Sequence, residues 1–180
     1  ALELCWQYSE ATPHHAQLQA DSKTIKHILK QAQKGSPWAQ YVASRIYRLG
    51  LGVSKNDQEA NKYLLAAAEG GNILGMIDTA QGYLSGSMGN INAEEGNKWY
   101  RKAAQAAETG GPIAHYLLGN MYSLGTGGIP SDENKALQWH IKSAEGGFPL
   151  GQLAAAKSLA AKNSSQKDLK KEFEDMKNQP

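Results

Sequence analysis

The sequence predicts an all-α protein made of repeated helical hairpins, because one spacing of aromatic residues occurs three times. Tyr47, Tyr83 and Tyr122 follow one another at intervals of 36 and 39 residues. A second aromatic series has intervals of 36 and 40 residues, and its members are Tyr63, Trp99 and Trp139. Internal repeats of about 20–50 residues are typical of solenoids and related arrays. We therefore expect one solenoid domain that spans residues 1–180.

Each repeat is predicted to contain two antiparallel helices. In the first repeat, Ala39, Ala43 and Tyr47 lie at four-residue spacing, which places them on one face of a helix. A glycine cluster that starts at Gly50 ends this helix, since glycine adopts the left-handed C-cap conformation without steric cost. The residues predicted to cap the second helices through their side-chain oxygens are Asn56, Asn92 and Asp132. We place the three repeats at residues 39–72, 75–111 and 114–148.

The two ends of the chain are predicted to form degenerate hairpins. Residues 1–36 form the N-terminal one, whose second helix covers residues 24–34. Residues 149–180 form a C-terminal capping hairpin from helices at 150–162 and 167–177. A solenoid needs polar terminal units of this kind to close its ends, and the total is about five hairpins.

The composition narrows the class of protein. A net charge of +2 is too small to indicate a nucleic-acid-binding protein. No apolar run approaches the roughly 20 residues that a transmembrane helix needs. Cys5 is the single cysteine, so an internal disulfide and a multi-cysteine metal site are excluded. Because the chain starts at Ala1, as after removal of a signal peptide, we expect a periplasmic or secreted protein.

The third repeat carries the fullest motif, Ala-x-x-x-Leu-Gly-x-x-Tyr, then a glycine turn, Lys-Ala and Trp. Its members are Ala114, Leu118-Gly119, Tyr122, Lys135-Ala136 and Trp139. This pattern resembles the Sel-1-like repeat family, which is related to the tetratricopeptide repeat. The resemblance implies a right-handed α-solenoid of about five antiparallel hairpins. It also implies a non-enzymatic scaffold or adaptor for another protein, in the bacterial envelope or secreted. Some members of the family resemble immunity proteins that neutralise a toxin effector.

The resemblance also implies where a partner binds. In the tetratricopeptide geometry the first helix of each hairpin lines a concave face. The residues expected to form this protein-binding face are Trp38, Tyr41, Arg45, Arg48, Gln81, Leu84, Tyr116, Asn120, Ser123 and Lys157. Tyrosine, tryptophan and arginine dominate the hot spots of protein interfaces. Tyr41 and Tyr116 have packing as an equally good explanation, whereas Arg45 and Arg48 have fewer packing roles.

An enzyme or small-molecule binder is the alternative function, because cysteine-rich relatives have been linked to β-lactams. No nucleophile–base pair stands out in the sequence, and this chain lacks the cysteines. His115 and His140 fall on the two helices of one hairpin, but a metal site there would need further ligands. We therefore expect no catalytic residue, no cofactor and no metal. A purely structural module is a third interpretation, which the polar ends disfavour.

Three other features have a structural and a functional interpretation. The glycine turns at Gly50 and Gly125 resemble phosphate loops, but they follow helices instead of strands and recur with the repeat. Trp99 and Trp139 occupy repeat positions that predict packing rather than binding. Lysines at positions 23, 26, 30 and 34 form a stripe that is either a solvated helix face or a dock for an acidic partner or an anionic surface.

Overall fold

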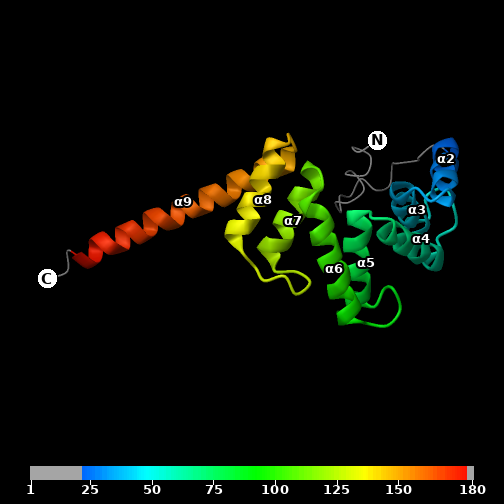
Figure 1. Cartoon of the computed structure of the whole chain (residues 1–180), viewed down its shortest axis with the longest axis horizontal. Helices are drawn as coiled ribbons and strands as arrows, with labels where there is room; N and C mark the ends of the chain where they lie inside the picture. Colours follow the sequence, from blue (N-terminus) through cyan, green and yellow to red (C-terminus); the bar gives the residue numbers. More distant parts are fainter. Residues whose placement is uncertain (1–21, 178–180) are drawn as a thin grey trace. The chain divides into compact units, whose positions relative to one another are not determined.

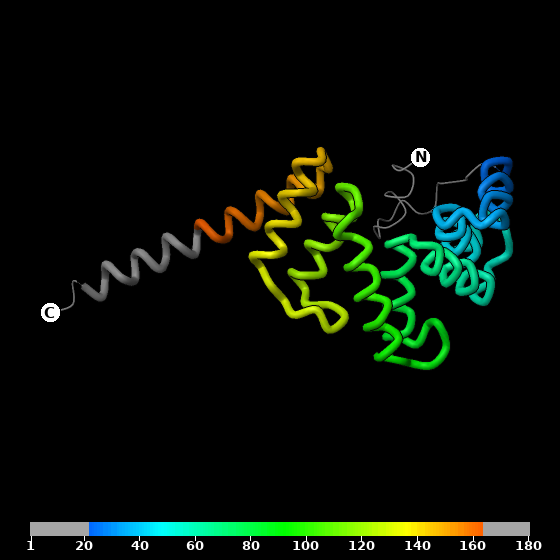
Figure 2. Tube along the Cα trace, viewed as in Figure 1, coloured from blue at the N-terminus to red at the C-terminus, as the bar shows by residue number. Residues whose placement is uncertain are grey.

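The structure is a computed structural model that describes the backbone of residues 22–177 and the side chains up to residue 163. The described residues form helices, turns and loops, with no strand among them (Figures 1 and 2). The helices are α2 (Ser22–Gln33), α3 (Pro37–Leu49), α4 (Asp57–Glu69), α5 (Ile73–Ser85), α6 (Ala93–Glu108), α7 (Pro112–Leu124), α8 (Glu133–Glu145) and α9 (Pro149–Lys177). The predicted all-α class is confirmed. The first helix of the predicted N-terminal hairpin lies outside the described residues.

The predicted helix caps are present. Asn56 accepts hydrogen bonds from the backbone N–H groups of Gln58 and Glu59, each at 3.1 Å, where α4 begins. Asp132 accepts one from Lys135 at 3.0 Å at the start of α8. These side chains satisfy donors that the first helical turn leaves free. α3 ends at a glycine with φ of +69°, as the glycine pattern predicted.

Contacts divide the chain into two compact units, Ala1–Trp99 and Tyr100–Pro180, which are described separately. In the first unit α2, α3, α4 and α5 pack in chain order. Buried alanines on α3 and α4 let these helices approach closely. Tyr47 and Tyr63, which belong to the two aromatic series of the sequence, stack with ring centroids 5.7 Å apart. The repeat signature is therefore a packing signature here, and Trp99 is buried as predicted.

In the second unit α7, α8 and α9 pack against one another. Leu118 on α7 and Ala136 on α8 are fully buried. Ser143 on α8 is also buried, and its hydroxyl donates a 2.6 Å hydrogen bond to the backbone carbonyl of Pro112. This bond satisfies a polar side chain that would otherwise be costly to bury.

The prediction of a C-terminal capping hairpin was wrong. Residues 149–177 form one continuous helix, α9, with no turn between positions 162 and 167 (Figure 1). The residues between the two predicted helices include Asn163, Ser164 and Ser165, which are weaker helix formers than alanine by only a few tenths of a kcal/mol each. No glycine or proline occurs from residue 152 to 177, so nothing strong enough ends the helix.

Candidate protein-binding groove

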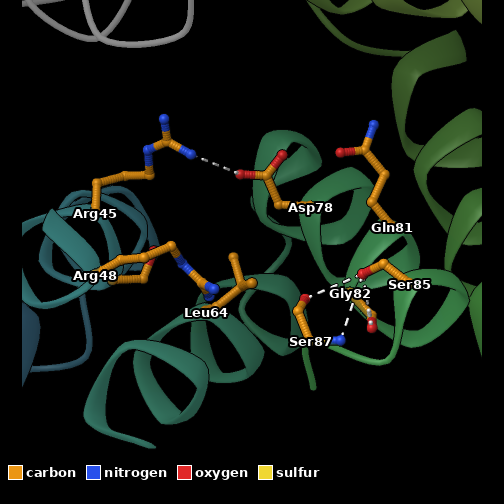
Figure 3. A pocket seen from close by; sticks show the side chains of 9 residues that line it. Arg45, Arg48, Leu64, Asp78, Gln81, Gly82, Ser85 and Ser87 are labelled. Carbon is orange, nitrogen blue, oxygen red and sulfur yellow. Dashed lines mark hydrogen bonds and ion pairs between the residues drawn. The ribbon is translucent and has the colours of Figure 1, made fainter. Parts of the chain in front are cut away.

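Three of the predicted binding residues in the first unit, Arg45, Arg48 and Gln81, line one groove (Figure 3). The groove has a volume of about 310 Å³. Its lining residues are Ser44, Arg45, Arg48, Leu64, Asp78, Gln81, Gly82, Ser85 and Ser87. They come from α3, α4, α5 and the loop after α5, so neighbouring repeats build the groove together.

Helical spacing explains why these side chains meet. Tyr41, Arg45 and Arg48 follow one another at steps of four and three residues on α3, so they share one face. Asp78 and Gln81 are three residues apart on α5 and lie across from the arginines (Figure 3). The groove thus has a basic wall on α3 and a mixed polar wall on α5.

Asp78 joins the two walls. Its Oδ2 atom lies 3.7 Å from Nη1 of Arg45 and accepts a 3.2 Å hydrogen bond from the hydroxyl of Tyr41. The side chains of Arg45 and Asp78 are 32% and 27% exposed. Burial raises the pKa of Asp78, while Arg45, the Tyr41 hydrogen bond and Arg48 act in the opposite direction. The arginines therefore only partly compensate for the desolvation of this carboxylate.

A chain of hydrogen bonds holds Arg48 in place. Its Nη2 atom donates to the side-chain oxygen of Asn61 on α4 at 2.8 Å. The Asn61 amide donates in turn to the backbone carbonyl of Ser87 at 3.0 Å. Because Ser87 lies in the loop after α5, these two hydrogen bonds link α3, α4 and that loop. They fix the rim of the groove that Arg48 and Ser87 form.

The other predicted residues of the first unit do not line the groove. Tyr41 is only 6% exposed and packs in a core cluster with Leu64, so its packing explanation has gained support. Trp38 and Leu84 are each 37% exposed and belong with Leu49 and Ile91 to the exposed large apolar side chains of this unit. Asp78 is the charged groove residue that the sequence analysis missed, although its three-residue spacing from Gln81 could have indicated it. The other lining residues that it missed are Ser44, Leu64, Gly82, Ser85 and Ser87.

The predicted residues of the second unit form a different arrangement. The ring of Tyr116 lies 5.8 Å from His140 and 5.4 Å from Phe148, measured between centroids. The side-chain oxygen of Asn120 lies 3.1 Å from Nε2 of His140. Ser123 on α7 is half-buried and Lys157 on α9 is exposed. Tyr116 and Asn120 therefore take part in packing around His140.

Comparison with known proteins identifies the repeat. The Sel1 repeat family model matches residues 39–72, 74–107 and 112–148, which is more than half of the chain. The chain belongs to the Sel1 repeat family. The predicted repeats differ from these matches by at most four residues at any boundary. Sel1 repeats are protein-interaction scaffolds, and the family is in general a non-enzymatic interaction fold.

Two solved structures support this assignment. The crystal structure of a Sel1 repeat protein from Oxalobacter formigenes is 31% identical, with a TM-score of 0.55 over 75% of this chain and 98% of that one. A protective antigen present in uropathogenic Escherichia coli strains, which displays an SLR fold, is 24% identical with a TM-score of 0.53. That similarity covers 85% of this chain and 32% of the antigen, and it bears on the fold alone. No curated protein matches the chain significantly.

The histidines of the third Sel1 repeat have different neighbours. His140 is 3% exposed, and burial lowers its pKa, against a smaller opposite effect of Glu133. His115 packs instead on Trp139, with ring centroids 5.3 Å apart. Among the described residues no group of three or more metal-binding side chains gathers.

The remaining candidates are surface features of the Sel1 repeats and their flanks. The lysines of the predicted stripe on and just after α2 are all exposed. Trp139 is half-buried, and Nζ of Lys142 lies 4.1 Å from the centre of its ring. This contact adds a cation–π interaction to the packing role that the sequence predicted. None of the helices in the described part of the chain is long and apolar enough to cross a membrane.

Proposed function

We propose that this Sel1 repeat protein is a non-enzymatic scaffold that binds another protein at the groove between α3 and α5. The observation that carries the proposal is that Arg45 and Arg48 of α3 and Gln81 of α5 line one open groove. Arginine is among the residues most enriched in interface hot spots, because its guanidinium makes several directed hydrogen bonds.

Two exposed apolar side chains support the same surface. Trp38 lies on α3 and Leu84 on α5, the two helices that carry the groove walls. A polar centre with large apolar side chains on the same helices is a combination that interfaces use. The equivalent face of the third repeat is occupied by its own aromatic cluster, so we place the main contact in the first unit.

Site-specific photocrosslinking tests the position of the interface. A photoreactive amino acid at Gln81 is expected to crosslink the partner in lysate of the source cells. The matched control is Gln58, an exposed glutamine in the first turn of α4 that does not line the groove. A band that appears equally from both positions, or only from Gln58, would move the interface elsewhere on the unit.

Mass spectrometry of the crosslinked band narrows the biological role. A secreted toxin effector would make the chain an immunity protein, and an envelope component would make it an envelope adaptor. Both outcomes agree with the proposed periplasmic or secreted location, whereas a cytoplasmic partner would contradict that location. The binding role at the groove is independent of which class is found.

A further inference from the structure

We propose that a second copy of this chain docks on the exposed face of α9, so that two copies pair through their α9 helices. The face consists of Leu153, Ala156 and Leu159, which follow one another at steps of three residues and so lie on one side of the helix. Leu153 and Leu159 are 51% and 44% exposed, and Ala156 is exposed between them. Binding of another protein at the groove of the first unit does not depend on this surface.

The beginning of α9 corresponds to the first helix of a repeat. It starts at Pro149, as α7 starts at Pro112, so a shift of 37 residues relates the two helices. By this shift, the positions of α7 that correspond to Leu153, Ala156 and Leu159 are Tyr116, Gly119 and Tyr122. The surroundings of these three positions in α7 show what the exposed face of α9 is built to contact.

In the third repeat the second helix, α8, covers all three positions. The ring centroids of Tyr116 and His140 lie 5.8 Å apart. Gly119 has no room for a Cβ atom beside the same histidine ring. Nζ of Lys135, which also belongs to α8, lies 5.3 Å from the centre of the Tyr122 ring. Each position on this face of α7 therefore contacts the helix that completes its repeat.

The first repeat covers the same face in the same way. Tyr41 is buried in a cluster with Leu64 of α4, and Tyr47 stacks on Tyr63 of α4. Between these two tyrosines lies Ser44, which is 1% exposed. In both repeats the face is thus closed by a second helix, whereas in α9 it is exposed to solvent.

Within the described residues, the chain supplies no second helix to α9. The first helices of the repeats, α3, α5 and α7, each end after 13 residues, but α9 continues as one helix to Lys177. α8 packs on another side of α9, where Gly151 and Ala155 are buried. A helix from another molecule can therefore approach the exposed face without displacing α8.

The pattern of the face is complementary to itself. Ala156 lies midway between Leu153 and Leu159. If two α9 helices run antiparallel about a two-fold axis at Ala156, Leu153 of each copy meets Leu159 of the other. The small alanines at the axis allow a close approach, and isologous contacts of this kind are usual in dimers. Gln152 and Asn163 lie on the same side of the helix and are uncharged, so identical faces do not repel each other there.

α2 of a second copy fits the exposed face less well. It precedes the first helix of the first repeat, so stacking of copies end to end would bring it to α9. Its apolar residues Ile25 and Ala32 are already buried within its own unit, and its exposed positions include Lys26 and Lys30. Lysines placed against Leu153 would lose hydration without an acidic partner. The antiparallel pair of α9 helices avoids this cost.

Analytical ultracentrifugation of the full chain tests the pairing. The 19.4 kDa chain should be monomeric at about 1 µM and mostly twice that mass at about 200 µM, because a short helix pair is a small and weak interface. L153Q/L159Q should remain monomeric at both concentrations. The matched control I91Q/L124Q removes two apolar side chains that are more exposed than either leucine and should dimerise as the unmodified chain does. Circular dichroism checks that each variant is folded.

Disulfide trapping tests the position of the two-fold axis. In a Cys5→Ser background, Ala156→Cys places one thiol of each copy at the axis and should give a disulfide-linked dimer on oxidation. Gln152→Cys is the control, because this exposed residue lies on the same side of α9 about one turn earlier. Its two copies would be about 12 Å apart along the paired helices. That distance exceeds the roughly 7 Å that a disulfide allows between Cα atoms, so the linked fraction should be at least about 10-fold smaller.

Three results would overturn the α9 pair. They are a monomer at about 200 µM, dimerisation of L153Q/L159Q as strong as that of the unmodified chain, and equal disulfide formation from Gln152→Cys and Ala156→Cys. A monomer would leave the face to a helix of a different protein, which contradicts a second copy as its occupant. Crosslinking of a partner from Gln81 stands or falls separately, since the dimer variants leave the groove residues unchanged.

Discussion

The first and third Sel1 repeats place different chemistry on the same positions of the fold. Tyr41, Arg45 and Arg48 of the first repeat lie 75 residues before Tyr116, Asn120 and Ser123 of the third. In the first repeat the two arginines line an open polar groove, while Tyr41 is buried. In the third, Tyr116 and Asn120 contact the buried His140, and Tyr116 also packs on Phe148.

Whether a repeat has an open groove or a packed cluster depends on the side chains of its second helix. Leu64 of α4 is an apolar neighbour of Tyr41, and the half-buried arginines of α3 line the groove beside it. His140 occupies the equivalent position on α8 and engages both Tyr116 and Asn120. Across the face, Asp78 of α5 corresponds to Ala154 of α9, which removes the acidic partner as well. The repeat thus keeps its alanine and aromatic core and varies a few positions to make either a groove or a filled cluster.

The largest effect should come from Gly119→Ala in the third repeat. A Cβ atom there would lie 2.5 Å from Nε2 of His140, and neither the helix backbone nor the buried ring can move away easily. We expect a loss of about 3 kcal/mol in the free energy of unfolding, the upper end for overpacking. Urea denaturation measures it. Gly111→Ala, at a glycine with no atom within 4 Å of the added Cβ, is the control and should lose far less.

A double-mutant cycle tells whether His140 is the cause. In a His140→Ala background the added Cβ has space, so Gly119→Ala should cost less than about 1 kcal/mol. An unchanged cost in that background would show that the helix contact of Gly119, and not the histidine, makes the third repeat different. The corresponding position in the first repeat is Ser44, which already carries a Cβ beside Leu64.

The next largest effect should be the pH dependence of the second unit. The folded pKa of His140 lies below its ordinary value, so the folded state prefers the neutral ring. Its contribution to stability is present above the unfolded pKa of about 6.5 and is lost as the pH falls towards the folded pKa. The slope cannot exceed about 1.4 kcal/mol per pH unit for one group. Thermal unfolding between pH 7.5 and 5 measures it.

The matched variants for this experiment are His140→Gln and His27→Gln. His140→Gln removes the titrating ring from the cluster and should flatten the curve. His27→Gln removes an exposed histidine of α2 and should leave the slope unchanged. If stability still depends on pH in the same way in His140→Gln, another group causes the acid sensitivity. The buried histidine would then not make the third repeat sensitive to acid.

The parts of the fold that the sequence predicted are those determined by local residues. Asn56 and Asp132 cap helices because their side chains reach N–H groups two or three residues away. The tyrosines at 47 and 63 stack because the repeat spacing brings them to one interface. The break predicted between residues 162 and 167 is absent from α9, because small differences in helix propensity do not end a helix without glycine or proline.

The groove itself depended on contacts between repeats, which spacing alone did not supply. Arg45 and Arg48 were predicted as binding residues because they lie on the free face of the first helix. Asp78 sits 33 residues after Arg45, and no local pattern pairs the two positions. Likewise, Asn120 was predicted to face a partner, but its side-chain oxygen contacts His140, which lies 20 residues later in the chain.

A smaller effect, of about 1 kcal/mol, should follow Asn61→Ala in the first unit. This change removes the acceptor of Arg48 and the donor to the Ser87 carbonyl, and a typical hydrogen bond contributes about that much. The variant should also loosen the loop after α5, because Asn61 no longer joins Arg48 to that loop. Amide hydrogen exchange should rise in that loop and not in α8. Unchanged exchange would show that the rim of the groove is held by other contacts.

The smallest effect should be that of Asp78→Asn on the free energy of unfolding. The sign of this change tells whether the Asp78–Arg45 pair in the groove behaves as an ordinary surface ion pair does. The folded pKa of Asp78 is raised above its unfolded value, so its favourable contribution is complete below about pH 3.9 and is lost as the pH rises through the folded pKa. The asparagine variant avoids this loss and keeps an acceptor for Tyr41. Relative to the unmodified chain it should therefore gain about 0.5 kcal/mol between pH 3.5 and 7, because the raised pKa of Asp78 already includes the opposing effect of Arg45. Asp57→Asn, which removes an exposed pair with Lys55, should show no such gain. A relative loss for Asp78→Asn would mean that the ion pair with Arg45 outweighs the cost of burying the Asp78 carboxylate.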